Sequence, residues 1–226
     1  MGVDGCRTGW VVATTGMDPD SPATIDVVRT IRDVIDAVRD GRVVAAGIDM
    51  PIGLAADGFR LADAEARRIL GPRRSSLFPT PPRAVLDATT FADALDRCRL
   101  ASGKGMSIQA YNLLAKMREV AAEMRPELQP AISEVHPETS FAVLCAGPCA
   151  HAKATAAGFA ERVDALRPHF ATLDQLLAPR RGVKADDLLD ALAAAWTARR
   201  VATGTARIFG DADARDELGF RLTISA

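Results

Sequence analysis

The hydrophobic and polar positions of the first fifty residues predict a sheet followed by a helix. Apolar runs at 2–6, 9–15 and 24–29 suit three strands with short links, which predicts an antiparallel meander. Residues 30–40 show helical periodicity, and Gly41 is placed to end that helix. The near-continuous apolar run at 42–48 is typical of a buried parallel strand.

The pattern becomes helical after this fourth strand. We expect residues 55–128 to form a helical insertion or subdomain within a single domain of residues 1–226, because a bare loop of that length is improbable. The apolar residues 131–135 return to the sheet as a fifth strand. Within the insertion, the expected elements are helices at 58–70, 88–100 and 106–124 and a loop at 71–85. After the fifth strand, the expected helices are 138–145, 153–167, 171–178 and 185–202.

Composition describes an ordinary globular protein, with 48% hydrophobic and 25% charged residues. No apolar run is long enough to span a bilayer, and the first residues do not resemble a secretory signal. The four cysteines form no compact disulfide framework, which predicts a cytoplasmic protein. A net charge of −1 argues against a general nucleic-acid coat protein, but a local basic patch remains compatible with it.

Acidic residues stand at the ends of core elements in three separate places. Asp4 and Asp49 end strand-like runs, and Asp186, Asp187 and Asp190 open the last long helix. Buried charges are costly unless they are paired or bind a cation, and converging carboxylates repel each other unless a metal neutralises them. This pattern is typical of a two-metal phosphoryl-transfer site.

Each acid also has a purely structural interpretation. Asp4 precedes Gly and suits a turn, and Asp49 suits a cap of the following loop. Asp186 or Asp187 would stabilise the helix N-terminus. Asp190 is harder to explain in this way, because it shares a helix face with two other acids.

Two further segments carry candidate chemistry. Glu134, His136 and Glu138 alternate at the end of the predicted fifth strand, which suits ligands or an acid–base pair, while Pro137 and Glu138 would also suit a helix start. Residues 67–83 contain five arginines and no acidic residue. Such a segment suits either phosphate binding or a solvated basic surface. Its arginines and hydroxyl residues are Arg67, Arg68, Arg73, Arg74, Ser75, Ser76, Thr80 and Arg83.

Five motifs in this order resemble one known family. They are Gly2-Val3-Asp4-Gly5-Cys6-Arg7, Ile48-Asp49-Met50-Pro51-Ile52-Gly53-Leu54, Arg74-Ser75-Ser76-Leu77-Phe78-Pro79-Thr80-Pro81, Glu134-Val135-His136-Pro137-Glu138 and Asp186-Asp187-Leu188-Leu189-Asp190-Ala191. The chain is similar to the family called domain of unknown function 429, described as predicted nucleases of the RNase H fold. The resemblance runs from the N-terminus to about residue 202.

The resemblance implies an RNase H-like α/β fold, with a mixed five-stranded sheet flanked by helices and a helical insertion after the fourth strand. It also implies a metal-dependent nuclease or phosphodiesterase that binds Mg²⁺ or Mn²⁺. The expected catalytic and metal ligands are Asp4, Asp49, Glu134, Asp187 and Asp190. The expected substrate-binding residues, for nucleic acid or another phosphodiester, are Arg7, Arg73, Arg74, Ser75, Ser76, His136 and Lys184.

Two other classes share this core fold. An actin-like kinase or ATPase would use the Asp4-Gly5 turn for nucleotide phosphates, although the chain offers no second glycine-rich phosphate loop and no second full domain. A binding module without catalysis is the other alternative. Metal titration separates that module from an enzyme, because it need not hold a catalytic ion.

Overall fold

The computed structural model describes residues 1–18 and 20–226 and contains a mixed five-stranded sheet with the strand order β3-β2-β1-β4-β5. The strands are β1 (Gly2–Cys6), β2 (Gly9–Thr15), β3 (Ala23–Val28), β4 (Ala46–Ile48) and β5 (Ile132–Glu134). The first three pair antiparallel, as the predicted meander requires, and β4 and β5 join β1 in parallel. The sheet confirms the predicted α/β fold with a mixed five-stranded sheet, and its strand order is consistent with an RNase H-like core.

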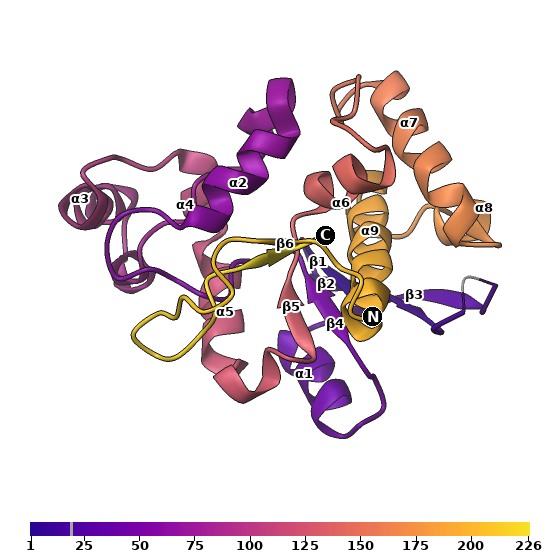
Figure 1. Ribbon diagram of the computed structural model, residues 1–226, viewed down its shortest axis with the longest axis horizontal. Coiled ribbons are helices and arrows are strands. Elements are labelled where there is room, and N and C mark those ends of the chain that lie inside the picture. Colours follow the sequence, from indigo (N-terminus) through magenta and orange to yellow (C-terminus); the bar gives the residue numbers. More distant parts are fainter. Residues whose placement is uncertain (19) are drawn as a thin grey trace.

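Helices cover both faces of the sheet (Figure 1). Alternation along β2 shows how the two cores divide. Trp10 and Val12 pack with α1 (Ile31–Arg39) and α5 (Leu114–Glu123) on one face. Val11 and Ala13 pack with α9 (Ala185–Ala202) on the other. Successive side chains of a strand point to opposite faces of the sheet. Since helices cover both faces, β2 is apolar at both sets of positions.

Helix α9 lies almost directly on the backbone of β1 and β4. Gly2 and Gly47 are register partners on these strands. A Cβ added to Gly2 would lie 2.0 Å from the backbone nitrogen of Ala195, and one added to Gly47 would lie 2.7 Å from the Ala194 carbonyl oxygen. Only glycine leaves room for this approach, and alanines on α9 supply the matching small surface.

The remaining helices follow the predicted order with shifted bounds. They are α2 (Leu61–Leu70), α3 (Phe91–Ser102), α4 (Ile108–Asn112), α6 (Pro137–Leu144), α7 (Ala156–Leu166) and α8 (Leu173–Leu176). The 3₁₀ turns are η1 (Gly71–Ser76), η2 (Arg83–Asp87), η3 (Pro126–Leu128) and η4 (Arg167–His169). The predicted helix 185–202 matches α9 at both ends.

Three local predictions were wrong. The fourth strand begins at Ala46 and not at residue 42, because the chain is still turning out of α1 there, with the Val43 amide bonded to the Ala37 carbonyl. The helix predicted at 106–124 is divided between α4 and α5. The segment 71–85, predicted as a loop, contains the turn η1 and the start of η2. Pro72 lies in the first positions of η1, and Pro82 directly precedes η2.

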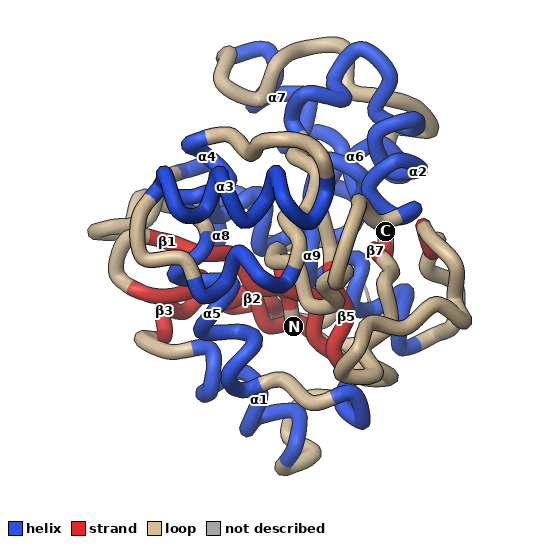
Figure 2. The backbone as a smooth tube through the Cα atoms, turned by 90° about the vertical axis from the view of Figure 1, so that its left-hand side faces the viewer, coloured by secondary structure: helices blue, strands red, loops and turns tan. Residues whose placement is uncertain are grey.

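Helices between β4 and β5 share the core of the sheet. Glu119 of α5 accepts hydrogen bonds from Trp10 Nε1 at 2.8 Å and from the Ile31 amide at 2.7 Å. It therefore ties α5 to a sheet strand and to the start of α1. Figure 2, turned by 90°, shows α3 and α5 in front of the strands.

The C-terminal segment adds a small hairpin that the sequence patterns did not predict. Strands β6 (Ile208–Phe209) and β7 (Ile224–Ser225) pair antiparallel, and Ser225 bridges to Val135 beside β5. Asp216 in this segment is buried and accepts the Leu54 amide at 3.0 Å, which fixes the segment to the chain after β4. None of the helices in the described residues is long and apolar enough to cross a membrane.

The contact between α9 and the sheet predicts that Gly2→Ala lowers stability by at least about 2 kcal/mol, because the new methyl group would overlap helix backbone that cannot move alone. In a chain of this size the thermal midpoint should fall by at least about 5 °C. Gly147→Ala is the control, because an added Cβ there has no neighbour within 4 Å. Equal melting temperatures for the two variants would contradict the tight contact.

Candidate metal centre

Three carboxylates from three separate elements meet at one point. Asp4 lies in β1, Asp49 directly follows β4, and Asp190 lies in the second turn of α9. One oxygen from each can be chosen so that all three lie within 4.8 Å of one another. The expected ligands were Asp4, Asp49, Glu134, Asp187 and Asp190. The geometry groups Asp4, Asp49 and Asp190, called the acidic cluster below.

Strand alternation and helix packing together explain the convergence. Asp4 is two residues after Gly2, and Asp49 is two residues after Gly47, so both carboxylates share the glycine face of the sheet. Helix α9 covers that face and begins only a few residues before Asp190. The close approach at the glycines therefore brings Asp190 down onto the two strand carboxylates.

Burial and mutual repulsion make the ionised cluster unfavourable without a cation. Burial, followed by the charges of Asp49, Asp190 and Asp187, raises the pKa of Asp4 well above its ordinary value. Burial and the charge of Asp190 do the same to the pKa of Asp49. Burial raises the pKa of Asp190 to about 6, although Lys153 acts in the opposite direction. Desolvation and like charges are the ordinary causes of such shifts.

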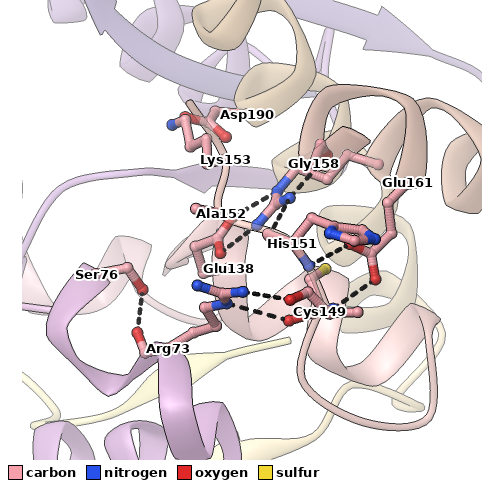
Figure 3. A network of polar contacts seen from close by, with 12 residues as sticks. Arg73, Ser76, Glu138, Cys149, His151, Ala152, Lys153, Gly158, Glu161 and Asp190 are labelled. Carbon is pink, nitrogen blue, oxygen red and sulfur yellow. Dashed lines mark hydrogen bonds and ion pairs between the residues drawn. The ribbon is translucent and has the colours of Figure 1, made fainter. Parts of the chain in front are cut away.

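Lys153 is a member of this site that the sequence patterns did not reveal. It precedes α7, and its ammonium forms an ion pair with Asp190 Oδ2 (Figure 3). The other oxygen, Asp190 Oδ1, is buried and has no hydrogen-bond partner. Within the described residues, Asp4 and Asp49 form no ion pair of their own, so one ammonium faces three carboxylates.

The acidic cluster lines a cleft of about 970 Å³. Residues of β1, the segment after β4, the chain before α6 and the start of α9 form part of its wall. Leu77 and Phe78, which directly follow η1, extend it. Half-exposed apolar side chains such as Phe78 and Leu113 lie on this lining. A substrate can therefore contact both the carboxylates and an apolar surface.

Two predicted ligands lie in the same cleft but have other partners. Arg60 donates to both carboxylate oxygens of Glu134, at 2.6 and 2.7 Å, and the Ile52 amide donates to one of them at 2.8 Å. Asp187 accepts the Lys184 amide at 3.0 Å and caps the start of α9. Among the described residues, the three carboxylates with oxygens within 4.8 Å of one another include neither Glu134 nor Asp187.

His136 and Glu138 divide in a similar way. Glu138 is buried and binds the Arg162 guanidinium through both oxygens, at 2.6 and 2.8 Å. His136 lines the cleft, and burial lowers its pKa to about 4, so the imidazole is neutral at pH 7. Its Nδ1 is buried without a hydrogen-bond partner.

The predicted substrate-binding residues separate into two groups. Arg7, Ser76 and Lys184 line the cleft with His136. Among the described residues, Arg73, Arg74 and Ser75 are not part of that lining. Arg73 instead donates to the backbone carbonyls of Cys149 and Ala150, which gives it a structural role in the loop before α7.

The donor set fits a hard divalent cation. Carboxylate oxygens are the ligands that Mg²⁺ and Mn²⁺ prefer. The acidic cluster provides oxygens at a spacing that one ion can bridge, including the partnerless Asp190 Oδ1. The carboxylates of Glu134 and Glu138 are already bound by arginines, and so they lie outside the candidate ligand set.

The comparisons with known proteins agree with the motif pattern. A family model described as a protein of unknown function, DUF429, matches residues 2–215. Searches of curated proteins and of solved structures gave no match. Since the matched region covers nearly the whole chain, this protein belongs to the DUF429 family.

Proposed function

We propose that this protein is a divalent-metal-dependent phosphodiesterase that acts on nucleic acid or on a smaller phosphodiester. The observation that carries the proposal is the convergence of Asp4, Asp49 and Asp190 on the wall of a large cleft. Buried carboxylates that repel one another destabilise a protein unless they serve a ligand. Metal binding explains why three buried carboxylates converge, whereas a capping or turn role for each single acid does not.

The charges around the cluster support a phosphate-bearing substrate. Arg7 and Lys184 are exposed cations on the cleft lining, and Ser76 adds a hydroxyl donor. Guanidinium and ammonium groups bind phosphate oxygens through charge-assisted hydrogen bonds. The apolar wall near Phe78 suits the organic part of such a substrate, as nucleobases stack on aromatic rings.

Each group has a defined task in this proposal. Asp4, Asp49 and Asp190 hold Mg²⁺ or Mn²⁺, which supplies Lewis-acid stabilisation of charge on a phosphoryl oxygen. Arg7 and Lys184 orient the phosphate from the rim. The neutral imidazole of His136 lines the cleft and contributes a hydrogen bond to the bound substrate.

Asp4→Asn tests the proposal. Hydrolysis of bis(p-nitrophenyl) phosphate, single-stranded DNA or single-stranded RNA with Mn²⁺ should fall at least about 100-fold, because a ligand contributes at least as much as its supporting residues. The metal-free thermal midpoint at pH 7.5 should stay the same or rise, because one repelling charge is gone.

Asp26→Asn is the matched control, because Asp26 is exposed on β3. It should retain wild-type hydrolysis. If the wild type hydrolyses none of the three substrates with Mn²⁺ or Mg²⁺, or if Asp4→Asn retains full activity, the proposed function is wrong.

The raised pKa of Asp190, about 6, predicts a pH-dependent response to metal. In the metal-free protein the stabilising contribution of the protonated group is fully present below about pH 4 and is lost as pH rises through about 6. Metal ligands must be deprotonated. The rise in thermal midpoint caused by Mn²⁺ should therefore be small at pH 5 and reach about 5–10 °C at pH 7.5 with Mn²⁺ at about 100 times its Kd.

Other groups in the cleft do not reverse this trend. His136 has a lowered pKa of about 4, which favours folding as pH rises whether or not metal is present. Lys153 has a raised pKa and stays charged throughout the window. Asp190→Asn should shrink the Mn²⁺ effect and reduce its pH dependence, and the raised pKa values of Asp4 and Asp49 should preserve the remainder. An Mn²⁺ effect of equal size at pH 5 and pH 7.5 would exclude the acidic cluster as the binding site.

A further inference from the structure

Lys153 enters the acidic cluster from a loop outside the sheet. The loop runs from the end of α6 to the start of α7, and the ammonium reaches Asp190 on α9. Asp190 has only 6% of its side chain exposed, whereas Lys153 keeps 36% exposed. The carboxylate is therefore fixed in the interior, and the lysine has solvent on one side into which it can withdraw.

Several side chains hold the loop in this position. Glu161 accepts the amides of Ala150 and His151 at 2.7 and 2.9 Å. Arg73 donates to the carbonyls on the other side of the loop (Figure 3). Arg162, which is paired with Glu138, also donates to the His151 carbonyl at 3.4 Å and so adds a further contact to the loop. Lys153 thus extends from an anchored backbone, and its own flexible side chain is the movable part.

The position of the ammonium conflicts with that of a divalent cation. An ion held by all three carboxylates needs an Asp190 oxygen. Oδ1 is free within the described residues and Lys153 contacts Oδ2, so the ion and the ammonium would share one carboxylate. Its positive charge also acts on Asp4 and Asp49. Two cations in this small space repel each other strongly at the low effective dielectric of a partly buried site.

We propose that Lys153 is a built-in counter-ion that exchanges with the divalent cation at the acidic cluster. The ammonium neutralises part of the cluster in the metal-free protein, and it withdraws toward the cleft when the ion binds. The exchange transfers no proton and breaks no covalent bond. This inference rests on the proposed metal site and adds that the metal affinity of this site is set by a competing side chain.

Calorimetric titration of Mn²⁺ into the wild type and Lys153→Met at pH 7.5 tests the exchange. Removal of the competitor should tighten Mn²⁺ binding at least about 10-fold. Lys104→Met is the matched control, because Lys104 is exposed over Phe59 and does not line the cleft, so the same loss of charge should leave affinity within about twofold.

The outcomes separate the two proposals. Equal or weaker binding by Lys153→Met, with measurable binding by the wild type, overturns the exchange and leaves the metal site intact. Absence of Mn²⁺ binding by all three proteins overturns both. Tighter binding by Lys153→Met alone, including binding that the wild type does not show, supports the exchange.

A second measurement uses the wild-type protein and does not depend on the folding of the variant. Amine acylation followed by mass spectrometry compares Lys153 with Lys104 in the presence and absence of saturating Mn²⁺. Withdrawal from Asp190 should raise the acylation rate of Lys153 several-fold and leave that of Lys104 unchanged. An unchanged or lower rate for Lys153 would overturn the exchange, because the ammonium would then still be paired.

Discussion

The contact between α9 and two glycines of the sheet is the constraint on which the site depends. Gly2 and Gly47 let the helix backbone lie where any other side chain would stand. Asp4 and Asp49 follow these glycines on the same face, and Asp190 lies near the start of the helix that covers it. The contact between α9 and the two glycines, which carry no functional side chain, thus sets the separation of the three carboxylates.

The electrostatics of the cleft separate satisfied acids from unsatisfied ones. Glu134 and Glu138 are buried, and each has an arginine bound to both oxygens. Such pairs offset part of the cost of desolvation. The acidic cluster has only Lys153 for three carboxylates, and Asp190 Oδ1 has no partner. The acidic cluster is therefore short of positive charge, and it opens on a cleft of about 970 Å³.

The sequence predicted the sheet, the order of the helices and, within a larger set of expected ligands, Asp4, Asp49 and Asp190, because strand ends and long apolar helices have strong local patterns. It did not decide between Asp187 and Asp190, since both share a helix face and only the depth of burial distinguishes them. It did not reveal Lys153, whose pairing depends on a loop held by tertiary contacts from Arg73 and Glu161. The Arg60 partner of Glu134 is 74 residues away, beyond any local pattern.

The central claim is that these three carboxylates form one metal-binding site. A crystal structure of the protein soaked with Mn²⁺ at pH 7.5, with anomalous diffraction to locate the ion, tests it most directly. The account predicts an anomalous peak within about 2.5 Å of carboxylate oxygens from Asp4, Asp49 and Asp190. A fully soaked crystal with no peak at this position, or with a peak only elsewhere on the surface, would contradict it.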